Sequence, residues 1–216
     1  MIKILIPAKK NSIGVPFKNR KLLQGTLNTI PDDWKQHTYV SSDDEYILNI
    51  ANLNGVIPVG RDSSLTKDDT STKSVILDFI ETQNIDDKDL IIMLYLTSPT
   101  RTWKNIEDAL DVYQKQNAKS LLCKNPCKVT PYLLMHAVGK YKGKQIIPHN
   151  FYRRQDHPEY FRISHCISMM QCDEVKNLNH DLYNEDTVFF LMEERGVDID
   201  SPEDLDEYLK DSNQQK

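Results

Sequence analysis

Two carboxylates near the C-terminal end of the chain, Asp198 and Asp200, have a spacing that suits a metal ion. In an extended segment alternate residues point to the same side, so both carboxylates face one way. Carboxylates so placed repel each other unless a cation lies between them. Mg²⁺ accepts few protein carboxylates and completes its shell with water and phosphate oxygens. The pattern therefore predicts a Mg²⁺ site, with one alternative: the acids are N-terminal charges of the helix that follows.

A basic segment near the N-terminus, residues 8–20, is rich in hydrogen-bond donors. The first 31 residues contain six Lys or Arg and no Asp or Glu. Cations and amide donors where a strand ends suit a polyphosphate. The segment carries neither GxxxxGK[ST] nor GxGxxG, so it is neither a P-loop nor a dinucleotide fingerprint. Two interpretations stay open at this point, a phosphate-binding loop and a solvated basic loop.

Other chemical patterns are absent from the sequence. The spacings Cys123-x3-Cys127 and Cys166-x5-Cys172 do not match the CxxC pairs of zinc sites. The histidines form no HExxH pattern, and no GxSxG elbow occurs. The basic segment lacks interleaved aromatic residues and the pI is about 5.7, which argues against nucleic-acid binding. The N-terminal apolar run is too short for a secretory signal, so we expect free thiols and a cytoplasmic location.

The composition bounds the class of protein. The 216 residues include 39% apolar and 27% charged residues, with a formal net charge of -5. That length supports a full hydrophobic core in a single domain over residues 1–216. No stretch approaches the ~20 apolar residues of a membrane-spanning helix, so we expect no contact with a membrane.

Apolar periodicity predicts alternating strands and helices. Short apolar runs at residues 2–7, 38–42, 56–60, 89–96 and 118–125 predict strands. Helical spacing over residues 43–55 predicts a helix, and residues 63–84 and 97–116 each predict a loop that runs into a helix. Such alternation predicts an α/β fold with a mostly parallel central sheet. Four polar segments follow these elements, namely 8–20, 41–44, 97–101 and 198–200. In a parallel sheet they would converge on one edge, where ligands bind.

The second half of the chain departs from this alternation. Tyr, His and Arg are dense between Tyr132 and Arg162, which predicts an insertion with its own strands rather than a regular βαβ unit. Near the C-terminus, Ser201 and Asp204 flank Pro202 in the pattern of a capping box, which predicts the start of a helix.

Six segments, in order, resemble motifs of the acylneuraminate cytidylyltransferases, the CMP-sialic acid synthetase family. Residues 6–19 (IPAKKNSIGVPFKN) resemble the family's nucleotide loop IPARxxSKxxPxKN, and residues 39–47 (YVSSDDEYI) resemble VSTDDEEI. Residues 61–72 (RDSSLTKDDTST) resemble RPxxLAxDxxxS, and residues 94–101 (LYLTSPTR) resemble LQPTSPLR. Residues 153–162 (RRQDHPEYFR) resemble RQxxPxxYR, and residues 196–205 (GVDIDSPEDL) end in a match to IDIDTPEDL.

The resemblance implies a three-layer α/β/α sandwich of the nucleotide-diphospho-sugar transferase kind, with a small dimerisation protrusion at about residues 130–170. It also implies that CTP and an acidic sugar are joined to a CMP-sugar with release of pyrophosphate, in a Mg²⁺-dependent homodimer. Lys18 and Asp200 match catalytic positions, and Asp198 and Asp200 match metal-binding carboxylates. The matching nucleotide-binding positions are Lys9, Ser12, Lys18, Asn19, Arg61, Thr72 and Thr97. The matching sugar-side positions are Arg154, Gln155 and Ser164.

Several positions depart from the family pattern. Lys9 replaces an arginine, Ile13 replaces a lysine, and Tyr95 with Leu96 replaces Gln-Pro. The family's Asn-Gly falls at Ser164-His165. These departures motivate two alternatives, a nucleotidyltransferase for another base or sugar and a non-catalytic relative that binds nucleotide.

Overall fold

The computed structural model describes residues 1–11, 14–67, 69–127, 129–192 and 197–214. Within these residues a seven-stranded sheet has the order β3-β2-β1-β4-β8-β5-β9. Its strands are β1 (Ile2–Pro7), β2 (Thr38–Ser42), β3 (Ile57–Gly60), β4 (Leu90–Met93), β5 (Ser120–Pro126), β8 (Phe161–Gln171) and β9 (Val188–Leu191). All neighbouring strands in it are parallel except that β8 runs antiparallel to both β4 and β5. The predicted α/β class with a mostly parallel sheet is confirmed.

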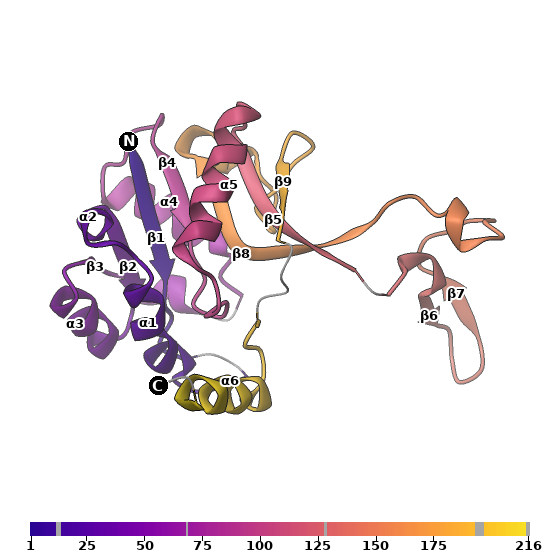
Figure 1. The fold of residues 1–216 in the computed structure, drawn as a ribbon, viewed down its shortest axis with the longest axis horizontal. Helices are drawn as coiled ribbons and strands as arrows, with labels where there is room; N and C mark the ends of the chain where they lie inside the picture. The colour runs from indigo at the N-terminus through magenta and orange to yellow at the C-terminus, as the bar shows by residue number, and fades with distance from the viewer. Residues whose placement is uncertain (12–13, 68, 128, 193–196, 215–216) are drawn as a thin grey trace.

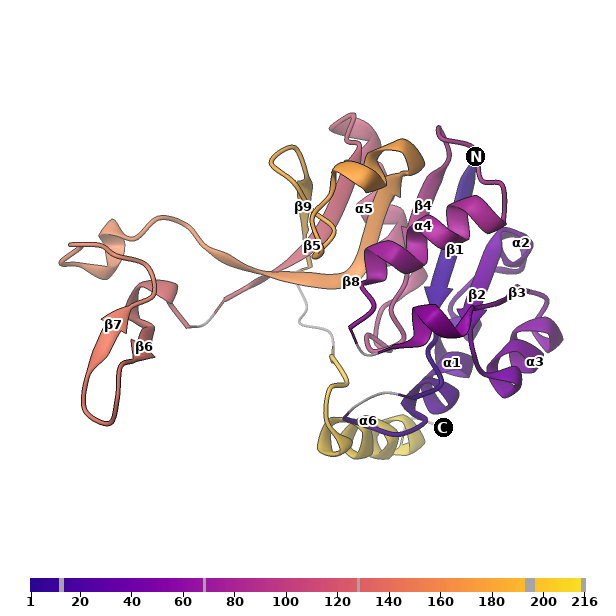
Figure 2. The same ribbon diagram turned by 180° about the vertical axis from the view of Figure 1, so that it is seen from behind.

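Helices cover both faces of the sheet, which gives three layers (Figures 1 and 2). One face packs against α1 (Lys18–Asn28), α3 (Glu45–Leu53), α5 (Trp103–Lys115) and α6 (Pro202–Gln214). The other face packs against α4 (Thr72–Thr82) and the 3₁₀ turn η4 (Cys172–Asn177). Three further short turns are α2 (Asp32–Lys35), η1 (Ser63–Thr66) and η3 (Arg154–Asp156).

The central strands are buried on both faces, because helices cover each of them. Ile4, Leu5 and Ile6 of β1 are fully buried, with Ile4 and Ile6 in one core and Leu5 in the other. A continuous apolar run is what a strand between two helical layers requires. Burial of this extent is the main force that holds the sheet edge, and the polar loops on it, in place.

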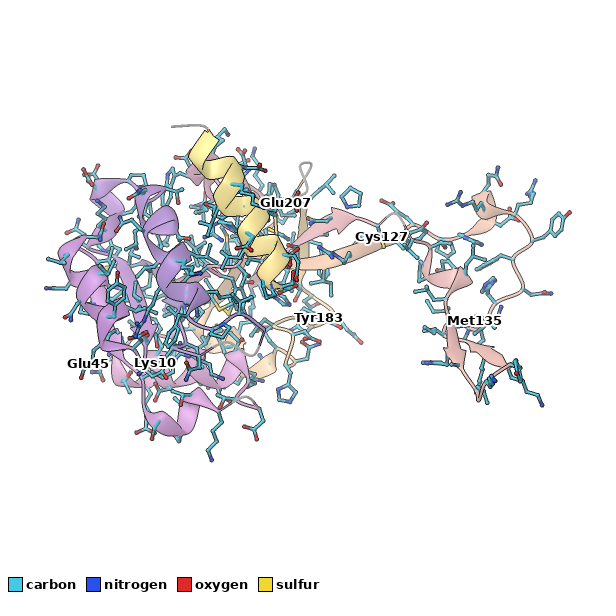
Figure 3. All side chains as sticks on the ribbon, turned by 90° about the horizontal axis from the view of Figure 1, so that it is seen from below. Lys10, Glu45, Cys127, Met135, Tyr183 and Glu207 are labelled. Atoms are coloured by element: carbon cyan, nitrogen blue, oxygen red, sulfur yellow. The ribbon has the colours of Figure 1, made fainter. Side chains whose placement is uncertain are left out.

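The long strand β8 links the sheet to an arm that extends away from it. Beyond Pro126 of β5 and before Phe161 of β8 the chain leaves the sheet, and it contains the turn η2 (Pro131–Leu133), η3 and a small hairpin of β6 (Met135–Ala137) and β7 (Gly143–Gln145). Figure 3 shows Cys127 at the base of this arm and Met135 near its far end. Several apolar side chains on the arm are exposed, Tyr152 at 96% and Leu133 at 67%.

The C-terminal helix begins as its sequence predicts. The backbone N–H of Ser201 donates to the Asp204 carboxylate at 2.8 Å, and the Asp204 N–H donates to the Ser201 hydroxyl at 3.2 Å. This reciprocal pair confirms the capping box. It orients α6 beside α1, at the carboxyl end of β1 (Figure 1).

Two local expectations differ from the structure. The basic loop expected over residues 8–20 ends before Lys18, because α1 begins there and buries Leu22, Leu23 and Leu27. The strand expected over residues 89–96 ends at Met93. Within the described part of the chain, no helix combines the length and apolar character that a bilayer crossing requires. The four cysteines are free thiols.

Candidate functional site

A cavity of ≈ 260 Å³ opens at the carboxyl ends of β1, β3 and β4. Every described residue that the resemblance assigns to nucleotide binding lines it: Lys9, Lys18, Asn19, Arg61, Thr72 and Thr97. Ser12 lies outside the described residues. The basic segment, the loop after β3 and the end of β4 therefore converge on one cavity, as expected for a parallel sheet.

Hydrogen bonds between neighbouring loops hold the basic segment at this cavity. The Asn19 amide donates to the carbonyl of Lys9 at 2.7 Å, and the Ser42 hydroxyl donates to the carbonyl of Ala8 at 2.6 Å. The backbone N–H of Lys10 donates to the Asp43 carboxylate at 2.7 Å. Ser42 and Asp43 thus position the basic loop rather than face the cavity.

The start of α1 is electrostatically suited to an anion. Its first turn contains no acidic residue, and no side chain caps it. The residue before it, Phe17, has a left-handed backbone (φ 56°). The N–H groups of Lys18 and Arg20 already donate to the carbonyls of Val15 and Phe17, so it is the helix dipole that favours negative charge at this end. Together with the cations of Lys9 and Lys18, it makes the cavity fit a polyphosphate.

Arg61 also lines this cavity. Its guanidinium donates to the carbonyl of Ser41 at 2.9 Å, which ties the end of β3 to β2. Burial lowers the pKa of Arg61, against the raising effect of Asp43 and Asp78. The apolar side chains of Leu65 and Val75 also line the cavity.

A second cavity, of ≈ 290 Å³, adjoins the first. Tyr95 and Thr97 line both cavities, so they form a shared wall. Ser164, Asp198 and Asp200 line the second cavity, which brings the predicted carboxylates together with one predicted sugar-side residue. The backbone N–H of Ile199 donates to the carbonyl of Thr97 at 2.8 Å and fixes the carboxylate segment against β4.

The two carboxylates influence each other. Although the Asp198 side chain reaches solvent, the protein packed around it raises its pKa, and the nearby Asp200 carboxylate raises it further. A hydrogen bond from Thr97 and the charges of Arg162 and Lys18 act in the opposite direction. A cation between the carboxylates would relieve this repulsion.

The donor set fits a magnesium ion that shares its shell with a substrate. Among the described residues, no group of three or more His, Cys, Asp and Glu side chains could enclose a metal ion. Asp198 and Asp200 therefore offer two carboxylates and leave the other positions open. Mg²⁺ is commonly bound in this way, by one or two carboxylates with water and phosphate oxygens.

Arg154 and Gln155 lie elsewhere. Both belong to η3 on the arm, where they are exposed, and they line neither cavity. The structure thus separates these two residues from Ser164, the third residue assigned to the sugar side. Arg101, at the end of a polar segment expected at the site, is buried and donates to the carbonyls of Tyr95 and Cys166 instead.

The residues that line the two cavities but were not predicted as site residues include Tyr95, His165 and Arg162. The hydroxyl of Tyr95 donates to Thr72 at 2.8 Å, and its ring meets that of His165 edge to face at 5.9 Å. Burial lowers the pKa of His165 and raises that of Tyr95. Arg162 lines the second cavity from β8. No periodicity of the sequence marked Arg162 or His165, because residues 162–166 of β8 line the second cavity consecutively.

Comparisons with known proteins agree with this architecture. No family model matches the chain. The chain is 26% identical over 168 residues to the N-acylneuraminate cytidylyltransferase of Streptococcus agalactiae serotype III (strain NEM316), with 73% of this chain and 40% of the relative covered. The serotype V protein of that name (strain ATCC BAA-611 / 2603 V/R) is 26% identical over 176 residues, with the same coverage. The chain thus spans 40% of the length of these curated relatives.

Solved structures share the fold. A CMP:2-keto-3-deoxy-manno-octonic acid synthetase complexed with CTP has a TM-score of 0.71 at 14% identity, with 100% of this chain and 99% of that chain covered. The 4-diphosphocytidyl-2C-methyl-D-erythritol synthase of Anaerococcus prevotii DSM 20548 has a TM-score of 0.64 at 14% identity, with 100% and 96% covered. These likenesses confirm the predicted fold class. The curated relatives confirm the resemblance to the acylneuraminate cytidylyltransferases.

Proposed function

We propose that this chain is a CTP-dependent nucleotidyltransferase that activates an acidic, sialic acid-like sugar to a CMP-sugar and releases pyrophosphate. One observation carries the proposal: a cavity lined by cations shares a wall with a cavity lined by carboxylates. The first suits a nucleoside triphosphate, and the second suits the molecule that attacks it. The names of the curated relatives and of the solved structures support the same chemistry.

We propose that the triphosphate lies at the lysine end of the first cavity. Lys9, Lys18 and the positive end of the α1 dipole offer charge to phosphate oxygens. The base then lies toward Thr72 and Tyr95, where apolar contacts and hydroxyls suit a heterocycle. This orientation directs the α-phosphorus to the shared wall.

In the proposed reaction a sugar hydroxyl oxygen forms a bond to the α-phosphorus. The bond from that phosphorus to the pyrophosphate oxygen breaks, and the hydroxyl proton leaves to water. Lys18 offsets the negative charge that the departing pyrophosphate carries. Thr97, at the shared wall, is placed to hold both substrates at the short separation that the transfer needs.

We propose Mg²⁺ as the cofactor, held by Asp198 and Asp200. When bound, the ion would supply charge neutralisation to the phosphate oxygens at this wall. The two carboxylates would hold the ion in a fixed position. Without the ion, they would repel a substrate phosphate. The raised pKa of Asp198 is consistent with a site that is completed by a cation.

We also propose that residues 1–216 act as one catalytic domain in a cytoplasmic homodimer, with residues of about 130–170 as the protrusion between copies. Exposed apolar side chains on the arm, such as Leu133 and Tyr152, support an interface there. Arg154 and Gln155 could then serve the sugar of a second copy rather than that of their own chain. Light scattering gives the mass, and a monomer would contradict the dimer.

Thermal unfolding with CTP, UTP, ATP or GTP, with and without Mg²⁺, tests the nucleotide. A ligand at about 100 times its Kd adds roughly 2.7 kcal/mol to stability. This corresponds to about 5–10 °C for a chain of this size. A Mg²⁺-dependent shift with CTP, followed by pyrophosphate release when an acidic sugar is added, supports the proposal. A shift with another nucleotide favours a different base, and no shift with any nucleotide overturns the proposal.

A further inference from the structure

The outer half of β8, residues 162–166, lines the second cavity. Three alternate residues of this segment, Arg162, Ser164 and Cys166, also line a small recess that shares them with the cavity, because alternate residues of a strand point to the same side. They change in character along the strand, from an exposed cation to a buried thiol. The cavity therefore has a charged outer end and a more apolar inner end.

Arg162 brings an unused cation to the outer end. Its guanidinium makes no hydrogen bond or ion pair with any described residue, although its charge acts on Asp198. A guanidinium presents a planar set of donors that matches a carboxylate in two parallel hydrogen bonds. An acidic ligand in this cavity would be repelled by Asp198 and Asp200 unless a cation such as Arg162 met its charge.

Asn125 of β5 lies directly opposite Arg162 in the strand register. Side chains in such a cross-strand pair project to the same side of the sheet, about 5 Å apart. Asn125 is only 5% exposed, and its side-chain oxygen has no hydrogen-bond partner among the described residues. A buried acceptor without a donor is unfavourable, so this oxygen needs a partner from outside the described chain.

Asn125 and Arg162 both line the same small recess. Asn125, Arg162, Ser164 and Asp198 line a small recess of ≈ 10 Å³ behind the second cavity. That volume admits a group about as large as one water molecule. A hydroxyl group or an N–H group of a bound ligand has this size and carries the donor that the Asn125 oxygen lacks.

We infer that Arg162 and Asn125 are a specificity-determining pair for the sugar, Arg162 binding its carboxylate and the Asn125 oxygen accepting from a neighbouring hydroxyl or N–H group. The inference rests on the proposed function and deepens it, since neither residue belongs to the site that the sequence predicts. The pair selects for an acid over its neutral carboxamide, because a carboxylate accepts two parallel hydrogen bonds from Arg162 and a carboxamide has only one acceptor oxygen. It also selects for a donor group at a fixed distance from that acid.

Steady-state kinetics with CTP, Mg²⁺ and N-acetylneuraminate, or its neutral C1 carboxamide, tests the pair. We expect the unaltered protein to prefer the acid by about 100-fold, and Arg162→Gln to reduce that preference to below about 5-fold. Asn125→Ala should raise the KM for the sugar by about 10-fold. The KM for CTP should change by less than about twofold in both variants. Arg153→Gln is the matched control, since Arg153 is an exposed arm residue paired with Asp156.

Two results would overturn the inference. One is an acid preference that survives in Arg162→Gln. The other is an unchanged sugar KM in Asn125→Ala with a lower unfolding midpoint, which would mean that a structural water occupies the recess. If the unaltered protein releases no pyrophosphate from CTP, the proposed function fails separately. In that case, calorimetric titration of N-acetylneuraminate into the unaltered protein and into Arg162→Gln tests the pair by binding alone. Weaker binding by the variant supports the inference. Equal binding by both proteins, or no binding by either, overturns it.

Discussion

The Lys18 ammonium donates a hydrogen bond to the carbonyl oxygen of Ile199 at 2.7 Å, across 181 residues of sequence. Lys18 is the first residue of α1 and lines the first cavity, while Ile199 lies between the two carboxylates that line the second. One side chain therefore joins the basic segment to the acidic segment. Burial and Asp200 raise the pKa of Asp198, and the charge of Lys18 opposes this rise, so the two halves of the site are coupled electrostatically.

Lys18→Gln should weaken CTP binding by about 10-fold or more, because a charge-assisted contact to phosphate is lost. Turnover should fall further, since the charge on the leaving pyrophosphate would no longer be offset. Titration of CTP and initial rates measure the two effects. Lys21→Gln, at an exposed position of the same helix, is the control and should change neither. Equal CTP affinity in both variants would remove Lys18 from the nucleotide site.

Gly14→Ala should displace the basic segment from the carboxylates. A Cβ at Gly14 would lie 2.7 Å from the carbonyl oxygen of Asp200, so the backbone of one segment must move. Such overpacking costs about 1–3 kcal/mol, and a small displacement of substrate-binding groups can cost ~10²-fold in rate. Gly60→Ala is the matched control, because nothing lies within 4 Å of its added Cβ. Urea unfolding and initial rates should separate the two variants, and similar results for both would contradict this prediction.

Much of the sheet could be predicted from the sequence, because buried strands are continuous apolar runs. Residues 2–7 and 38–42 match β1 and β2 to the residue. Helix α1 could not be predicted in the same way, since its first turn is polar and lacks a capping side chain. It forms because Leu22, Leu23 and Leu27 are buried against the sheet, and this is a tertiary effect.

The candidate site likewise contains residues that could be predicted from the sequence and residues that could not. Residues 198–200 and the basic segment carry their chemistry in their own spacing, and parallel topology predicts that they meet. Arg162 and Asn125 could not be predicted, because their pairing depends on the register of two strands separated by the arm. Asp43 and Asp44 belong to segment 41–44, which was expected at the site, but the structure gives their side chains another role. Their carboxylates accept local hydrogen bonds from Lys10 and Tyr46, so acidic residues at a strand end turned out to be structural.

Asp44→Asn should be less destabilising than Asp44→Ala, and the difference should be about 1 kcal/mol. Asp44 accepts from the N–H of Tyr46 at 3.1 Å and caps α3, and Asn caps a helix as well as Asp does, whereas Ala does not. Asp44 also accepts two hydrogen bonds from Arg20, at 2.7 and 2.9 Å, which both variants weaken or lose. Equal losses of stability in urea would show that the cap contributes nothing.

The stability that Asp44 provides should also depend on pH. The hydrogen bond from Arg20 is the largest cause of its lowered pKa. A lowered pKa stabilises the fold above the ordinary value of about 4, and that contribution is lost as the pH falls through the folded value. The difference in free energy of unfolding between the unaltered protein and Asp44→Asn should therefore be full at pH 7 and shrink below about pH 4. A difference that stayed constant down to pH 3 would contradict this.

Asp198→Asn should separate stability from metal-dependent binding. Burial and the nearby Asp200 raise the pKa of Asp198, so its ionised form destabilises the folded state above the folded pKa, and this penalty fades as the pH falls toward about 4. Without ligand at pH 7, the unfolding midpoint of the variant should therefore equal or exceed that of the unaltered protein. With CTP, its Mg²⁺-dependent rise should disappear, because one of the two carboxylates proposed to hold the ion is gone.

Asp206→Asn, at an exposed position on α6, is the control and should keep the Mg²⁺-dependent rise. A lower midpoint for ligand-free Asp198→Asn, or an intact Mg²⁺-dependent rise with CTP, would show that the carboxylate pair is structural.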